Sequence, residues 1–253
     1  TSVILQDRLK LSHSCVAFDI SLGCSAFCYG LSVVYGMMQS GGIRKALILD
    51  GETRSKVYSP KDRRSAFLFG DGGVAALVER DEKFGKSYFS LNSDGSRADL
   101  IMIKGGGYRH PSSEETLREK VVDEYGNIRS DEQGYMQGGD VFNFVIREIP
   151  RDIKKTLEYT ADSFDYIVFH QANNFINAYI AKKMKLDTDK IPSTIAKYGN
   201  TSSVSVPLTI VSELKDRLYG NKKLLLSAFG VGMTWATGIV PFVDCKISDI
   251  VEV

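Results

Sequence analysis

Hydrophobic and polar positions divide the chain into segments of two kinds. Short apolar runs of strand length, such as 46–50 and 224–227, alternate with longer stretches in which apolar residues recur at helical spacing, such as 25–39 and 203–218. Each helical stretch ends at a glycine, the residue that most often follows the last turn of a helix. The pattern predicts an α/β protein in which strands and helices alternate along the chain.

Two parts of the chain repeat the same order of elements. The first part has Cys24, the 25–39 helix, the 46–50 strand, Gly70-Asp71-Gly72-Gly73 and a strand over 74–78. The second part has Asn200, the 203–218 helix, the 224–227 strand, Gly230-Val231-Gly232 and a strand over 234–240. Such self-similarity indicates an internal duplication of a strand-helix-strand-strand unit. Cys24 and Asn200 then occupy equivalent positions, facing each other across a pseudo-two-fold axis.

Composition narrows the class of protein without identifying its chemistry. With 43% hydrophobic and 25% charged residues, the 253-residue chain has the balance of an ordinary globular protein. Its 32 basic and 31 acidic residues create no overall field that would favour nucleic acid or a membrane as partner. No apolar run has the length of a membrane span, and no charged-then-apolar leader is visible, so we expect a cytoplasmic protein.

The cysteines do not form a metal-binding or disulfide pattern. None of the four, Cys15, Cys24, Cys28 and Cys245, belongs to a paired CxxC motif, and the three histidines are not spaced to join them. We therefore expect no metal site, and small buried hydrophobic roles for the cysteines other than Cys24.

Three polar residues stand at junctions between elements. Cys24 follows the strand-like run Val16–Ile20 and opens the 25–39 helix, where unpaired backbone N–H groups and the helix dipole favour a thiolate. His170 ends the strand predicted over 166–169, and Asn200 precedes the 203–218 helix. Open α/β sheets place their chemistry at such junctions. Together the residues supply a nucleophile and two polarising groups.

The surrounding motifs resemble a known family. His170-Gln171-Ala172-Asn173 and Gly199-Asn200-Thr201-Ser202 lie thirty positions apart and are followed by Phe229-Gly230 and Thr234-Trp235. From about Asp7 to Asp244 the chain resembles the C-terminal two-thirds of β-ketoacyl-acyl carrier protein synthase III, a thiolase-fold condensing enzyme. The resemblance implies two pseudo-symmetric halves in layered α-β-α-β-α order, the first half truncated, with a strand-helix series expected before Thr1.

This resemblance also implies a division of the chain. Residues 1–103 would be the remainder of the N-terminal half and carry the cysteine, and 138–253 would be the C-terminal half with the histidine and asparagine. Residues 104–137, which are rich in charge and glycine, would form an inserted surface loop with some helix.

The implied reaction is a decarboxylating Claisen condensation of an acyl thioester with a malonyl thioester. In the family the cysteine, here Cys24, accepts the acyl group, and the matching His170 and Asn200 stabilise the enolate formed when carbon dioxide leaves. Backbone N–H groups of Cys24 and Val231 would form the oxyanion hole, with Val231 standing where the family commonly has glycine. Coenzyme A thioesters are substrates, and no separate cofactor is expected.

Further residues match binding positions of the family. Arg63 matches a contact to the nucleotide end of coenzyme A, and four residues match the pantetheine tunnel: Met136, Gly138, Asn173 and Phe229. Lys182 and Lys183 match a basic patch that docks acyl carrier protein, whose surface is acidic. Phe175 stands where the family usually has Arg, which leaves a coenzyme A thioester or a divergent carrier open as the malonyl donor. Family members pair through a continuous sheet, so we expect a homodimer.

Two alternatives remain open on the sequence. In the first, Cys24 still forms an acyl-enzyme but the acyl group passes to an amine or an alcohol without decarboxylation. In the second, the chain is a catalytically impaired fragment or a partner subunit.

Overall fold

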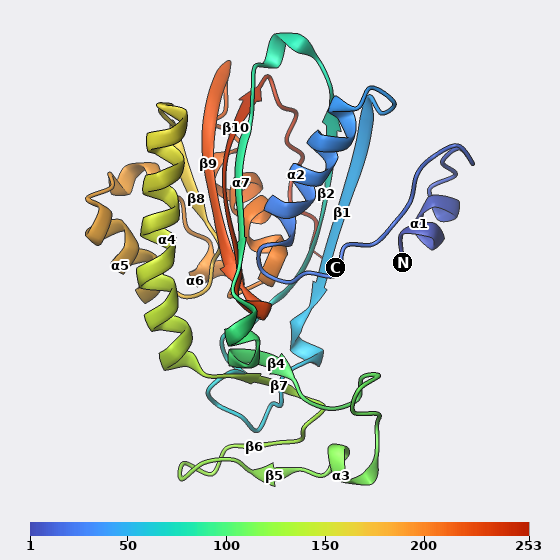
Figure 1. Cartoon of the computed structure of the whole chain (residues 1–253), viewed down its shortest axis with the longest axis vertical. Coiled ribbons are helices and arrows are strands. Elements are labelled where there is room, and N and C mark those ends of the chain that lie inside the picture. The colour runs from blue at the N-terminus through green and yellow to red at the C-terminus, as the bar shows by residue number, and fades with distance from the viewer. Residues whose placement is uncertain (253) are drawn as a thin grey trace.

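The computed structural model describes residues 1–252 and shows helices and sheets in layers (Figure 1). The central layer is a four-stranded sheet in the order β3 (Tyr88–Ser93), β10 (Thr234–Val243), β9 (Asn221–Gly230) and β8 (Tyr166–Phe169). β8 and β9 are parallel, whereas β10 is antiparallel to both β9 and β3. The parallel pair brings the ends of β8 and β9 to the same edge of the sheet.

The central sheet is buried on both faces because its strands are apolar at consecutive positions. On β9, Leu225 and Phe229 face one core, and Leu224, Leu226 and Ala228 face the other. Successive side chains of a strand point to opposite faces, so an uninterrupted apolar run fits a sheet that is covered on both sides.

Different helices cover the two faces of this sheet. α4 (Gly138–Thr160) and α5 (Asn174–Met184) pack on one face, and α2 (Ala26–Gln39) and α7 (Ser205–Leu214) pack on the other (Figure 1). The apolar residues of α4 recur at helical spacing and bury a single stripe that includes Val145, Ile149 and Ile153.

A second, two-stranded sheet lies against the opposite side of α2. It pairs β1 (Lys45–Thr53) with β2 (Asp71–Glu79) in antiparallel register. The order helix, strand, antiparallel strand therefore occurs twice, as α2-β1-β2 and α7-β9-β10, which agrees with the predicted pseudo-symmetric halves. α1 (Ser2–Arg8) lies on the far side of the β1-β2 pair (Figure 1).

The structure corrects two sequence-based expectations about elements. The run Val16–Ile20 is extended but pairs with no strand among residues 1–252, because no neighbouring backbone there supplies a hydrogen-bond ladder. The helix predicted over 203–218 begins later and ends earlier, as α7. A 3₁₀ turn over Ser202–Val204 precedes α7, because Ser202 has φ of +54°, outside the helical region.

The segment 104–137 projects from one end of the molecule (Figure 1). It contains α3 (Glu114–Leu117) and a small hairpin of β5 (Lys120–Val121) and β6 (Ile128–Arg129). Its last strand, β7 (Gly134–Met136), pairs with β4 (Ile101–Ile103) and leads directly into α4. α6 (Ile195–Tyr198), a single turn, lies between α5 and α7. Within residues 1–252, no helix is both long and apolar enough to cross a membrane.

We expect Ile149→Ala to lower the free energy of unfolding by about 2–5 kcal/mol, the range for truncating a fully buried aliphatic side chain. Ile149 is 0% exposed at the centre of the α4 stripe. Val121→Ala is the matched control, because that side chain is 68% exposed on the projecting hairpin. Urea denaturation of both variants measures the difference, and equal stability of the two would contradict the assignment of the core.

Candidate active site

Cys24 lies in the turn that leads into α2, two residues before the first helical residue, Ala26. Its side chain is partly buried and meets the end of β9. A Cβ atom added to Gly230 would lie 2.5 Å from the Cys24 sulfur. Any residue larger than glycine at the end of β9 would therefore displace the nucleophile. The neighbouring Ser25 hydroxyl shares a 2.7 Å hydrogen bond with that of Thr234, which ties this turn to the start of β10.

His170 follows the last residue of β8 and is almost completely buried, with 1% of its surface exposed. Its Nδ1 lies 2.7 Å from the Ser205 hydroxyl, and its ring packs edge-on against Phe229 with centroids 5.4 Å apart. These two contacts fix the ring plane, so the other ring nitrogen, Nε2, is left for Cys24. The charge of His170, and its hydrogen bonding, lower the pKa of the Cys24 thiol.

Asn200 is held beside these two residues by its own backbone and amide group. Its backbone N–H donates to the Leu68 carbonyl at 2.8 Å, and its side-chain Nδ2 donates to the Ala172 carbonyl at 3.3 Å. Its Oδ1 accepts from the backbone N–H of Ser202, whose hydroxyl lies 3.7 Å from the Cys24 sulfur. The fold therefore brings together the three residues that the sequence selected.

Opposing effects set the acidity of the Cys24 thiol. Burial alone raises its pKa, because the charged thiolate loses solvation. The charge of His170, hydrogen bonds from His170 and Ser202, and the backbone N–H of Val231 together outweigh that cost. The pKa of Cys24 falls from 9.0 to about 7, so a substantial fraction is thiolate at neutral pH.

Cys28, one helical turn further along α2, has no such partners. Burial raises the pKa of its thiol to about 12, and the side chain belongs to the core between α2 and the central sheet. The contrast between Cys24, just before α2, and Cys28, within it, distinguishes a reactive thiol from a packing residue. Among residues 1–252, no cluster of His, Cys, Asp or Glu is arranged to hold a metal ion.

The backbone N–H of Val231 is a hydrogen-bond partner of Cys24 that lowers the pKa of its thiol. The Val231 side chain packs against the residue before the nucleophile, because a Cβ added to Gly23 would lie 2.3 Å from Val231 Cγ1. The space that a glycine at 231 would leave open is thus filled, and Gly23 must remain glycine to accommodate it.

The remaining predicted residues occupy different surroundings. Phe229 is buried against His170, and Met136 packs on the same core at the end of β7. Asn173 caps α5 by accepting from the Ile176 N–H at 2.8 Å, and Gly138 begins α4 with open space around its Cα.

The predicted charged contacts lie on the surface. Arg63 is exposed, and its backbone N–H donates to Asn127 Oδ1. Lys182 and Lys183 are exposed on α5, where the Lys183 ammonium donates to the Ile146 carbonyl at 2.6 Å.

Sequence reasoning missed the hydroxyl and charged groups that surround the nucleophile. Ser205 orients His170, Ser202 contacts the sulfur, and Arg54 donates to the Ser202 hydroxyl at 3.1 Å. The run Ser202-Ser203-Val204-Ser205 was a visible signal, since its three hydroxyls lie within five positions after Asn200, at a helix start. Arg54 gave no such signal, because only the tertiary structure brings the end of β1 to Cys24.

We expect iodoacetamide to alkylate Cys24 at a rate that rises with pH and reaches half its plateau near pH 7, because only the thiolate reacts. Cys28 should stay unmodified in the folded protein over the same range. His170→Ala should move the Cys24 midpoint to higher pH, since burial is then less opposed. Peptide mass spectrometry across pH measures both effects, and an unchanged midpoint in His170→Ala would refute the proposed pairing.

Gly230→Ala should reduce alkylation of Cys24 and destabilise the fold by about 1–3 kcal/mol, the usual cost of forcing extra volume into a packed site. Gly36→Ala is the matched control: Gly36 lies on α2 with nothing within 4 Å of the added Cβ. There alanine should be neutral or stabilising by up to about 1 kcal/mol. If both variants behave alike in denaturation and alkylation, the close approach of β9 to Cys24 does not matter.

Comparison with known proteins agrees with this geometry. Two family models match: 3-oxoacyl-[acyl-carrier-protein] synthase III over residues 18–95, and the C-terminal region of the same family over residues 155–242. The beta-ketoacyl-[acyl-carrier-protein] synthase III of Alkalilimnicola ehrlichii is 32% identical over 246 residues, which cover 96% of this chain and 72% of that protein. A putative 3-oxoacyl-[acyl-carrier-protein] synthase 3 of Campylobacter jejuni is 35% identical, covering 99% and 70%.

Solved structures give the same result for the fold. A crystal structure of a 3-oxoacyl-(acyl-carrier-protein) synthase III superposes with a TM-score of 0.90 at 35% identity, covering 95% of this chain and 73% of that one. The Burkholderia xenovorans enzyme gives a TM-score of 0.87 at 35% identity, covering 98% and 70%. The fold is thiolase-like, and the chain belongs to the 3-oxoacyl-[acyl-carrier-protein] synthase III family of condensing enzymes.

Proposed function

We propose that this protein condenses an acyl-coenzyme A with a malonyl thioester, with loss of carbon dioxide, through an acyl group carried on Cys24. One observation supports this most directly. The Cys24 thiol combines a pKa of about 7 with contacts to His170 and to the turn that holds Asn200. A buried nucleophile flanked by two nitrogen donors suits acyl transfer followed by enolate chemistry.

The first step acylates the enzyme. The Cys24 thiolate attacks the thioester carbonyl, and the C–S bond to coenzyme A breaks as the new C–S bond forms. The negative charge that develops on the carbonyl oxygen is balanced by the backbone N–H groups of Cys24 and Val231. Coenzyme A leaves as a thiolate, which takes up one proton.

The second step forms the carbon–carbon bond. The C–C bond to the malonyl carboxylate breaks, carbon dioxide leaves, and the electron pair becomes an enolate at the thioester carbonyl. His170 Nε2 and Asn200 Nδ2 donate hydrogen bonds to that enolate oxygen. The enolate carbon attacks the acyl group on Cys24, a 3-oxoacyl thioester is released and the Cys24 thiolate is regenerated.

The binding of the larger substrates is proposed at the residues matched by resemblance. Arg63 would contact the nucleotide end of coenzyme A, and Met136, Gly138, Asn173 and Phe229 would border the pantetheine path. Lys182 and Lys183 would attract an acidic carrier protein. The neighbouring Phe175 is 68% exposed and stacks on Phe142, so this part of the surface is aromatic. It supports a carrier contact with an apolar component.

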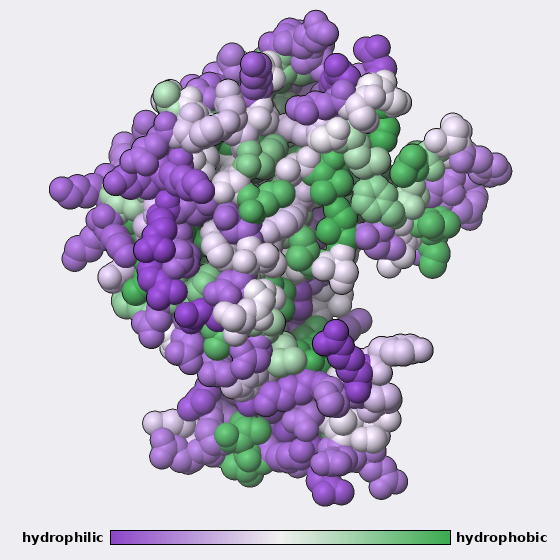
Figure 2. Space-filling model, viewed as in Figure 1, coloured by the Kyte–Doolittle hydropathy of each residue, from purple (hydrophilic) through white to green (hydrophobic). Residues whose placement is uncertain are grey.

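We also propose that the protein acts as a homodimer in the cytoplasm. Exposed apolar side chains on the β1-β2 pair, among them Leu47, Leu49 and Leu77, support association through this part of the molecule. Figure 2 shows hydrophobic surface gathered over this region, between α2 and α1.

His170→Ala or Asn200→Ala should slow malonyl decarboxylation by about 100-fold or more, the effect of losing one donor to a developing oxyanion. Acylation of Cys24 should suffer less, because the backbone oxyanion donors remain. Release of labelled carbon dioxide measures the first step, and intact-protein mass spectrometry measures the second. Cys24→Ala is the control that must lose the adduct. Equal losses in both steps would make His170 a general base for the thiol instead, and acyl transfer without any decarboxylation would point to an amine or alcohol acceptor.

A further inference from the structure

A charged pair lies close to the nucleophile and is linked to it through the Ser202 hydroxyl. Arg54, the first residue after β1, donates through Nη2 to Glu52 Oε1 at 2.9 Å and to the Ser202 hydroxyl at 3.1 Å. The Ser202 hydroxyl lies 3.7 Å from the Cys24 sulfur. One hydroxyl group therefore separates the guanidinium from the atom that carries the acyl group.

The pair is sheltered from solvent. The side chains of Arg54 and Glu52 are 20% and 13% exposed, so both charges have lost much of their hydration. Hydrophobic side chains of similar volume are often as stabilising as a sheltered ion pair, so its presence beside a nucleophile suggests a role in recognition. The inner face of β1 changes character at this end, from Ala46 and Ile48 to Asp50 and Glu52.

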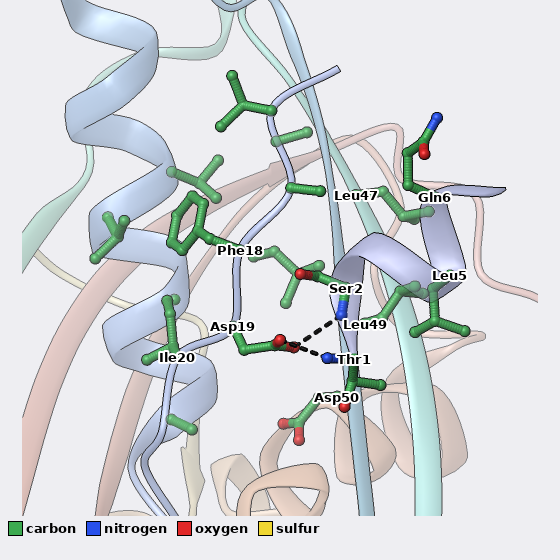
Figure 3. Close-up of a pocket in the computed structure, with 18 of the residues that line it drawn as sticks. Thr1, Ser2, Leu5, Gln6, Phe18, Asp19, Ile20, Leu47, Leu49 and Asp50 are labelled. Atoms are coloured by element: carbon green, nitrogen blue, oxygen red, sulfur yellow. Dashed lines mark hydrogen bonds and ion pairs between the residues drawn. The ribbon is translucent and has the colours of Figure 1, made fainter. Parts of the chain in front are cut away.

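Ser202 and Arg54 border the nucleophile close to a hollow in the surface. The Ser202 hydroxyl contacts the Cys24 sulfur and accepts a hydrogen bond from Arg54. Arg54 and Glu52 also line a hollow of about 1010 Å³, which reaches along β1 beneath the N-terminal residues. Figure 3 shows Asp50 at one end of this hollow, on the same strand as Leu47 and Leu49.

The charges of Asp50, Glu52 and Arg54 together favour the binding of a neutral polar group over that of an anion. Glu52 Oε1 and Asp50 Oδ1 both accept from the single hydroxyl of Ser203, and Asp50 Oδ2 has no partner within residues 1–252. Burial, and then the charge of Glu52, raise the pKa of Asp50. Two carboxyl groups thus face one guanidinium, and an acyl chain with its own carboxylate would be repelled.

A substrate hydroxyl group matches the hydrogen-bonding atoms that Arg54 and Glu52 leave unused. Among the described residues, the hydrogen bonds of Arg54 use only Nη2, and Glu52 Oε2 accepts none. A substrate hydroxyl can accept a hydrogen bond from Arg54 Nε or Nη1 and donate its own proton to Glu52 Oε2. An unsubstituted aliphatic chain would instead displace water from Arg54 Nε and Nη1 and from Glu52 Oε2 without replacing its hydrogen bonds, at a cost in binding.

We propose that Arg54 and Glu52 form the recognition end of the acyl pocket and select an acyl group that bears a hydroxyl near the thioester, over a plain aliphatic acyl group. This inference rests on the proposed acylation of Cys24 and adds the chemical class of its first substrate. The selectivity arises because a site built to hydrogen-bond a substrate hydroxyl discriminates strongly against an analogue that lacks it.

The test is a competition for Cys24 among butyryl-, 3-hydroxybutyryl- and succinyl-coenzyme A at equal concentrations, read by intact-protein mass spectrometry. We expect the 3-hydroxybutyryl adduct to exceed the butyryl adduct by about 10-fold or more in the natural protein. Arg54→Leu should remove or reverse that preference. Lys56→Leu, on the same turn but exposed to solvent, is the matched control and should keep it.

Arg54→Leu alone leaves the Glu52 carboxylate without its ion-pair partner, which could destabilise the fold. The double variant Glu52→Gln with Arg54→Leu removes both charges and tests the selectivity without that unpaired carboxylate. If butyryl-coenzyme A labels Cys24 to the same extent as 3-hydroxybutyryl-coenzyme A, the proposed selectivity is refuted, but the proposed acylation of Cys24 is supported. A preference for succinyl-coenzyme A would show that Arg54 binds the carboxylate of the acyl group, and it would also overturn the proposal. If none of the three thioesters labels Cys24, the proposed function and this inference both fail.

Discussion

The close approach of Gly230 to Cys24 is the contact on which the rest of the site depends. A strand end and a helix start, far apart in sequence, can meet only because Gly230 has no side chain and leaves room for the sulfur. That approach also aims the Val231 N–H at the sulfur. Because β9 pairs in parallel with β8, it further places His170, which follows β8, at the same edge. The absence of a side chain at Gly230 therefore lets the Cys24 thiol, the Val231 N–H and the His170 imidazole come together.

The reactivity of the nucleophile follows from a balance between burial and polar contacts. The same burial that leaves Cys28 inert acts on Cys24, but there His170 and the Ser202 hydroxyl outweigh it. Both helpers are held by the chain around Asn200: Ser205 orients the imidazole, and the φ of +54° at Ser202 directs its hydroxyl to the sulfur. Backbone strain of this kind persists where the surrounding structure enforces it, as at active sites.

Two departures from the family pattern, Val231 and Phe175, lie outside the three polar residues Cys24, His170 and Asn200. Val231 fills space beside Gly23, and Phe175 makes the surface near α5 aromatic. Arg54 and Glu52 add a sheltered charged pair next to the Ser202 hydroxyl. The three polar residues match the family pattern, while the shape and polarity of the surroundings are set by residues of this chain.

The sequence by itself determined the order of elements, the duplicated unit and the three polar residues, because hydrophobic periodicity and local motifs are properties of neighbouring positions. It placed β8 at 166–169 and predicted the 25–39 helix closely. It could not determine that Val16–Ile20 lacks a strand partner within residues 1–252, nor that a 3₁₀ turn beginning at Ser202 replaces the start of the predicted 203–218 helix, since pairing and positive φ depend on distant contacts. Only the tertiary structure placed Arg54 beside Cys24, because β1 must first fold against α2 before its end can reach a nucleophile thirty residues earlier.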